Sequence, residues 1–139
     1  MSSEDEIRNL SRQFYAGLTR MANGDAGPLS EVWLHGAMVT AMHPIGGRQV
    51  GWDAVKTSFE QVAQLASDGK IEVKDQLIQV SGDMGYEVGV EQGRLTLAGQ
   101  QVKIENRVTN IYQREAGVWK MTHHHTDTSQ AMLDVLSRL

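Results

Sequence analysis

Residues 107–127 read RVTNIYQREAGVWKMTHHHTD, and this stretch decides the fold. Two runs with β-branched and aromatic residues flank the turn segment REAG, which predicts a β-hairpin. Side chains alternate faces along a strand, so His123 and His125 share one side while His124 lies on the other. The three consecutive histidines therefore belong to two faces of the sheet.

The register of this hairpin predicts which residues accompany His124. A tight turn that sets Arg114 opposite Gly117 places Arg107 opposite His124. A single β-bulge would reverse this assignment. Without a bulge, one face is polar and the other suits packing: Arg107, Thr109, Ile111, Thr122, His124 and Thr126 on the first, and Val108, Tyr112, Trp119, Met121, His123 and His125 on the second.

The remaining chain divides at residue 71 into a helical and a strand-like half. Four runs with a period of two residues predict an antiparallel meander, and in the second run Gly93 marks a change of parity that predicts a bulge. Before residue 71 the apolar spacing is mostly helical. The expected elements are helices over 4–22 (with a Ser3/Glu6 capping box), 28–33 and about 52–69 (closed by Gly69), strands over 37–44, 71–80, 84–97, 102–114 and 117–127, and a short C-terminal helix.

Helices followed by a curled antiparallel sheet predict an α+β fold. The N-terminal helices are expected to pack on one face of the curved sheet, giving a cone-shaped fold that encloses a pocket. A length of 139 residues is in the range of one domain, so we expect a single domain over 1–139.

Composition excludes several classes of function. The chain is 40% hydrophobic and 22% charged, with a formal charge of -4, so it has no basic excess for nucleic acid. There is no cysteine, no apolar run that could span a bilayer and no secretory signal, so we expect a cytoplasmic protein without a membrane partner. The glycine-rich stretch HPIGGRQVG (residues 43–51) lacks a phosphate-binding pattern, and we expect a loop and no cofactor.

Residues 41–55, AMHPIGGRQVGWDAV, together with residues 107–127 resemble the SnoaL-like members of the nuclear transport factor 2 and ketosteroid isomerase superfamily. The resemblance covers nearly the whole chain. Residues 107–127 are also similar to the association domain of calcium/calmodulin-dependent protein kinases. The resemblance implies the cone-shaped fold and a pocket for a small hydrophobic or anionic molecule.

The resemblance also implies positions for a catalytic site. His43, before Pro44, stands where the isomerase has its aspartate base, and Tyr15 is the counterpart of its tyrosine donor. Thr109, eight residues before Gly117, replaces its second carboxylic acid. The remaining expected pocket residues bind the ligand: Arg107, His124, Thr126 and, at the cavity mouth, Trp52.

Alternatives accompany these roles. His43 could instead be a hydrogen-bonded histidine at a strand end, and Arg107 a cross-strand partner of Glu72, Glu87 or Glu105. A metal site formed by His123, His125 and Asp127 is conceivable on a strand, but without a second such motif we expect no metal.

Two functions remain open from the sequence. The first is a cofactor-free isomerase, dehydratase or cyclase acting on a hydrophobic carbonyl compound, with His43 as acid/base. The second is a non-enzymatic ligand-binding or assembly domain. In either case we expect a homodimer formed through the outer face of the sheet, where His123 and His125 lie.

Overall fold

The computed structural model describes all 139 residues and contains three α-helices, one short 3₁₀ helix and six strands. Their order along the chain is α1 Ser3–Met21, η1 Gly27–Glu31, β1 Thr40–His43, β2 Gly46–Val50, α2 Trp52–Leu65, β3 Ala66–Ser81, β4 Met84–Leu97, β5 Gln100–Glu115, β6 Val118–Thr126 and α3 Gln130–Leu136.

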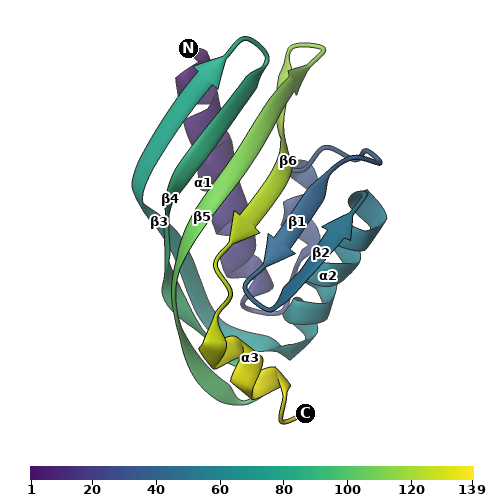
Figure 1. The fold of residues 1–139 in the computed structure, drawn as a ribbon, viewed down its shortest axis with the longest axis vertical. Helices are drawn as coiled ribbons and strands as arrows, with labels where there is room; N and C mark the ends of the chain where they lie inside the picture. Colours follow the sequence, from purple (N-terminus) through teal and green to yellow (C-terminus); the bar gives the residue numbers. More distant parts are fainter.

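The strands form one sheet in the order β2-β1-β6-β5-β4-β3. Figure 1 shows this sheet as a single curved layer, with α1 and α2 behind it and α3 at the end where the C-terminus lies. The predicted α+β class is therefore confirmed. The sheet is mixed rather than wholly antiparallel, because β1 runs parallel to β6.

The N-terminal helix begins one residue earlier than predicted. Ser2, not Ser3, is the N-cap: its hydroxyl accepts from the Asp5 backbone at 3.1 Å, and the Asp5 carboxylate accepts from the Ser2 backbone. The sequence offers two overlapping capping boxes, and the structure uses the earlier one. The inward stripe of α1 carries Phe14 and Leu18 into one core of 27 buried residues.

The prediction of a loop over 43–51 was wrong for most of that stretch. Gly46–Val50 is a strand that pairs with β1 after a turn at Pro44 and Ile45. This edge strand lacks an apolar alternation, so periodicity could not reveal it. The prediction that Gly69 ends the helix before the meander was also wrong, because α2 ends at Leu65 and Gly69 lies within β3.

The bulges that curl the sheet lie in β3, not at Gly93 in β4. Asp68 and Gly69 together oppose one residue of β4, and Asp75 and Gln76 do the same, with both aspartates at positive φ. The alternation of β4 is consequently unbroken, and its odd-numbered residues face the helices along its whole length. Gly93 instead provides a close approach between the two strands.

We expect Gly93→Ala to lower the free energy of unfolding by about 3 kcal/mol, because the new methyl group would collide with the Lys70 carbonyl oxygen. Urea denaturation measures the loss. Gly36→Ala is the matched control, since a Cβ there meets only Leu34 at an ordinary 3.8 Å. Equal stability of the two variants would contradict the close approach of β3 and β4 at Gly93.

Candidate functional site

The β5–β6 hairpin turns at Ala116 and Gly117, both at positive φ, so that Glu115 pairs with Val118. Its register then shifts at Thr122, an extra residue between the Tyr112–Met121 and Ile111–His123 pairs. His124 therefore lies opposite Asn110. The predicted pairing of Arg107 with His124 was wrong, because this bulge exchanges the faces of the residues on its two sides.

Alternation along β6 separates the three histidines, and the bulge before them sets their pairing with β5. His124 is only 2% exposed and lies on the face covered by the helices. His123 and His125 lie on the outer face, where their rings are 5.9 Å apart and Thr40 Oγ1 bonds His123 Nδ1 at 2.6 Å. No group of three or more histidine, aspartate or glutamate side chains has a metal-binding arrangement, and Asp127 is held by an arginine.

Three predicted pocket residues lie outside the pocket. Arg107 points outward, and its guanidinium donates hydrogen bonds of 2.9 and 3.0 Å to the two carboxylate oxygens of Asp127. These bonds lower the pKa of the Asp127 carboxyl. Thr109 pairs with His125 on the outer face, so it cannot replace an acid inside. Trp52 stacks on His35, with 4.5 Å between the ring centres, on a different surface.

Thr126 is buried on the inner face, as the family resemblance implied, but it does not line the cavity. Its hydroxyl donates to the Asp127 carbonyl oxygen at 3.0 Å. The structure thus gives this side chain a local role at the end of β6.

His43 ends β1 and lies inside, 6% exposed. Ser58 Oγ donates to the Val55 carbonyl oxygen at 2.6 Å and is 2.7 Å from His43 Nε2, so Nε2 carries the hydrogen and donates to it. Burial lowers the pKa of His43 to about 4. At neutral pH this imidazole is uncharged, and its Nδ1 lone pair makes no hydrogen bond.

His43 and His124 open onto one cavity of about 40 Å³, enough for about one water molecule. Their ring centres are 6.1 Å apart. Apolar side chains from α1, α2, α3 and the sheet form most of the wall, and one acid, Glu91, completes it. The apolar lining residues are Leu18, Met21, Pro44, Ile45, Phe59, Val62, Ile71, Leu95, Ile104 and Met132.

Glu91 is 3% exposed, and burial raises its carboxyl pKa to about 7. Tyr15, whose pKa is raised well above its usual value by burial, donates to Glu91 Oε2 at 2.9 Å. His124 Nε2 is 3.9 Å from the same oxygen, but burial lowers the pKa of His124 well below its usual value. Burial disfavours the charged form of both groups, so His124 stays uncharged and no ion pair forms, while Glu91 takes up a proton near its pKa of about 7.

A second acid, Glu87, lies four residues before Glu91 on the same face of β4 and is fully buried. Ser11, Gln76, Asn110 and Tyr112 all donate to its two oxygens. Four donors are the full complement of an ionised carboxylate. Glu87 therefore anchors a polar network that joins α1 to β3, β4 and β5.

Asn110 links this network to the cavity. Its amide nitrogen donates to Glu87 at 3.0 Å and to the Tyr15 hydroxyl at 3.1 Å, so its oxygen faces His124 Nδ1 at 2.7 Å. A carbonyl oxygen only accepts, so His124 carries its hydrogen on Nδ1 and presents the Nε2 lone pair to Glu91. The Tyr15 hydroxyl, occupied as an acceptor, directs its hydrogen to Glu91.

The sequence profile of the SnoaL-like domain family matches residues 7–129, which are 123 of the 139 residues. The chain is a SnoaL-like domain. None of its helices has the length and hydropathy that a membrane span requires. No curated protein sequence matches it.

Solved structures place the SnoaL-like domain in the nuclear transport factor 2-like fold. A candidate dehydratase of that family from Streptomyces avermitilis is similar with a TM-score of 0.79 and 22% identity, over 91% of this chain and 96% of that one. A superfamily protein from Salmonella enterica has a TM-score of 0.80 and 13% identity, over 91% and 92%. The CaMKII hub of S. rosetta has a TM-score of 0.74 and 16% identity, over 93% and 98%.

Sequence reasoning missed the two acids of the SnoaL-like domain. Glu87 was expected, if anywhere, as a partner of Arg107 on a solvated surface. The sequence did contain a signal for them. Glu87 and Glu91 are odd-numbered residues of β4, as are the core residues Leu95 and Leu97, so all four side chains lie on the same face of the strand. Acids at core positions of a strand are costly and indicate a function or a network.

We expect Asn110→Ala to destabilise the SnoaL-like domain by about 3 kcal/mol, because partners on Glu87, Tyr15 and His124 are lost together. Asn106→Ala is the control on the same strand and face, since the Asn106 amide nitrogen is buried without a partner.

Nitrogen-15 NMR should show His124 in the Nδ1–H tautomer, and Asn110→Ala should mix the tautomers. A wild-type Nε2–H tautomer would contradict the network.

Proposed function

We propose that this SnoaL-like domain is a cofactor-free acid–base catalyst that moves a proton on a small hydrophobic carbonyl compound, as an isomerase, dehydratase or cyclase does. One observation carries the proposal: an imidazole and a carboxyl group with displaced pKa values line the same apolar cavity. Burial lowers the pKa of His43 to about 4 and raises that of Glu91 to about 7. Between these two pKa values His43 is an unprotonated base and Glu91 is a protonated acid, so both forms are present at the same pH.

His43 is the base in this proposal. Its donor bond to Ser58 fixes the ring and leaves Nδ1 as the lone pair that receives the proton. Its low pKa keeps it unprotonated at neutral pH without any counter-charge. Abstraction of a proton from carbon leaves an electron pair that moves to the carbonyl oxygen, which therefore needs a hydrogen-bond donor.

Glu91 is that donor when it is protonated. No neighbouring group accepts the acid hydrogen of Glu91. Tyr15 donates to Oε2 of the Glu91 carboxyl group, which strengthens the hydrogen bond that Glu91 can donate to the carbonyl oxygen of the substrate. His124 Nε2 faces the same carboxyl group, but burial lowers the pKa of His124 well below its usual value. His124 therefore does not take the proton from Glu91. The enclosure by apolar side chains strengthens each of these bonds.

A substrate larger than water requires the cavity wall to move. Met21 on α1 and Met132 on α3 line the cavity, and methionine side chains repack at low cost. The apolar wall selects an apolar body for the substrate, and the two titratable groups select a carbonyl function within it.

The candidate dehydratase from Streptomyces avermitilis supports the enzymatic proposal, because dehydration is also an acid–base reaction on a similar fold.

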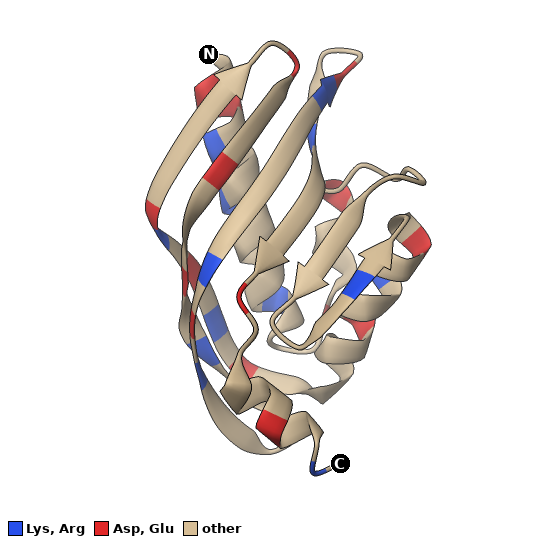
Figure 2. Cartoon of the chain, viewed as in Figure 1, with Lys and Arg blue, Asp and Glu red and all other residues tan.

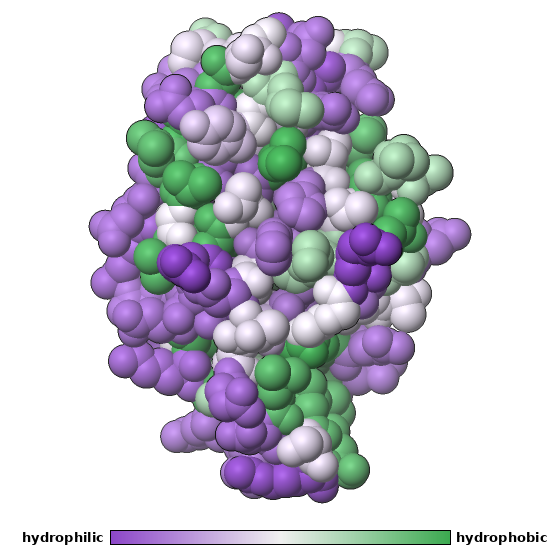
Figure 3. Space-filling model, in the orientation of Figure 1, coloured by the Kyte–Doolittle hydropathy of each residue, from purple (hydrophilic) through white to green (hydrophobic).

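The CaMKII hub of S. rosetta favours the second candidate function, an assembly domain. On the outer face, Leu77, Met84 and Tyr86 are 51, 49 and 44% exposed. We propose a homodimer through this face, part of which is seen in Figure 3 as green among purple.

The expected activity is exchange of hydrogen for deuterium at the carbon beside a carbonyl group. We would incubate the protein with enolisable ketones, from cyclohexanone to β-tetralone, in deuterated water and follow the exchange by proton NMR. The wild type should accelerate exchange over buffer, and His43→Ala and Glu91→Gln should each lose about 100-fold or more of it. Near-ultraviolet circular dichroism checks that both variants are folded.

The pH dependence identifies the roles. A neutral His43 is present above its pKa of about 4, and a protonated Glu91 is present below its pKa of about 7, so the rate should be highest between these values. His125→Ala, on the outer face, should keep the wild-type rate. Exchange no faster than buffer with every ketone, or equal rates in the wild type and both cavity variants, would contradict the proposal.

A further inference from the structure

The imidazole of His124 carries one polar atom that the fold leaves without a hydrogen bond. Its Nδ1–H donates to the Asn110 side-chain oxygen at 2.7 Å, so its Nε2 holds a lone pair. His124 is 2% exposed and lines the cavity, and the Glu91 oxygen that faces Nε2 is 3.9 Å away, too far for a hydrogen bond. A buried acceptor without a donor costs free energy, so this lone pair indicates a ligand that donates a hydrogen to it.

Three polar side chains line the cavity, and each needs a different counterpart on a ligand. His43 Nδ1 and His124 Nε2 are acceptors, and protonated Glu91 is a donor. In the proposed proton transfer, the hydrogen on carbon goes to His43 and the carbonyl oxygen accepts from Glu91. Nothing in a plain ketone serves His124, because a carbonyl group has no hydrogen to donate. A ligand that displaces water from Nε2 without replacing its hydrogen bond loses affinity.

The donor that His124 accepts from is expected to be uncharged. No lysine or arginine lines the cavity. Figure 2 shows none on β1 or α3, two of the elements that form its wall. An anionic ligand would therefore lose its hydration without gaining a counter-charge, which is costly in an apolar enclosure. A hydroxyl group is a small neutral donor that suits so small a space.

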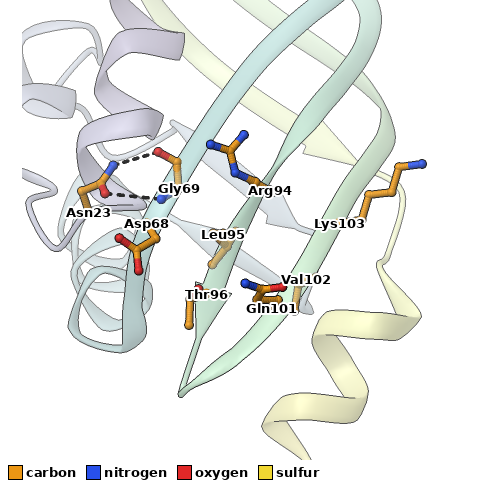
Figure 4. A pocket seen from close by; sticks show the side chains of 9 residues that line it. All are labelled: Asn23, Asp68, Gly69, Arg94, Leu95, Thr96, Gln101, Val102 and Lys103. Atoms are coloured by element: carbon orange, nitrogen blue, oxygen red, sulfur yellow. Dashed lines mark hydrogen bonds between the residues drawn. The ribbon is translucent and has the colours of Figure 1, made fainter.

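The larger hollow beside Gly69 has no comparable group. Its volume is about 600 Å³, and Figure 4 shows the side chains that line it. The polar ones are exposed or partly exposed, and Asn23 bonds the backbone nitrogen and oxygen of Gly69 at 3.3 and 2.9 Å. The buried lining residues, Leu95 and Val102, are apolar. No polar side chain of this hollow is kept out of water as His124 is.

We infer that the ligand of the cavity is a neutral hydroxy ketone, whose carbonyl oxygen accepts from Glu91 and whose hydroxyl group donates to His124 Nε2. Nε2 lies 3.9 Å from the Glu91 carboxyl oxygen, so the two oxygens of the ligand lie close together. The hydroxyl group is therefore on the carbon next to the carbonyl carbon (α) or on the following one (β). His124 thereby becomes the residue that selects hydroxylated compounds, since a site built to bind a hydroxyl group discriminates against the analogue without it.

This assignment rests on the proposed proton transfer only for the place of the carbonyl group beside His43 and Glu91. The place of the hydroxyl group rests on the lone pair of His124, which takes no proton in the reaction. Binding therefore tests the hydroxyl contact, and deuterium exchange tests the proton transfer. Either can fail while the other holds.

The test compares ketones that share one apolar body. Benzylacetone has no hydroxyl group, its α-hydroxy and β-hydroxy derivatives each carry one, and the methyl ether of the β-hydroxy derivative keeps the oxygen but not its hydrogen. NMR measures their binding to the nitrogen-15-labelled protein and their deuterium exchange, at a pH between the pKa values of about 4 and about 7. At least one hydroxy ketone should bind about tenfold or more tightly than benzylacetone and the methyl ether.

His124→Leu removes the acceptor and should bind the hydroxy ketones no more tightly than benzylacetone. His125→Leu, at the next residue but on the outer face, should keep the wild-type preference, and near-ultraviolet circular dichroism checks both folds. Equal wild-type affinity for benzylacetone and both hydroxy derivatives, equal affinity for the methyl ether, or a preference that survives in His124→Leu would overturn the assignment, whatever the exchange rates. A hydroxyl preference without deuterium exchange would sustain it and contradict the proton transfer instead.

Discussion

Two carboxyl groups buried on one strand are the constraint on which this structure depends. Glu87 and Glu91 both face the helices from β4, and an isolated buried carboxylate would cost more free energy than a small fold can supply. The molecule meets the cost in two ways. Four hydrogen-bond donors surround Glu87, whereas Glu91 has Tyr15 alone and takes up a proton near neutral pH.

The difference between the two acids follows from where α1 covers the sheet. Over Glu87 the helix supplies Ser11, and the bulge of β3 turns Gln76 inward to donate as well. Over Glu91 the helix supplies Tyr15, and beside Glu91 lies the small, mostly apolar cavity. His43 lines the same cavity from β1, which is separated from β4 by β6 and β5 in the sheet. The two acids thus differ in their hydrogen-bond donors, and we propose that only Glu91 takes part in chemistry.

Much of the fold could be predicted from the sequence, because periodicity and turn residues report local structure directly. The four long strands and α1 follow from them, whereas the inward side of His124 was implied by the family resemblance. The site could not be predicted as well, since a single extra residue at Thr122 moves Arg107 and Thr109 to the outer face. The expected bulge at Gly93 also hid both acids, because it assigned Glu87 and Glu91 to the solvent side. Register is a tertiary property, and alternation within one strand does not determine it.

The resemblance to the SnoaL-like family correctly placed His43 and Tyr15 on the inner side of the sheet. It gave no indication of Glu91, the acid that lines the cavity. The central claim is accordingly that Glu91 is a carboxylic acid held neutral near physiological pH. Carbon-13 NMR of the glutamate side chains, with Glu91→Gln to assign the signal, measures this most directly. The account predicts that the Glu91 carboxyl titrates with a pKa of about 7, and a pKa at the ordinary glutamate value of 4.5 would contradict it.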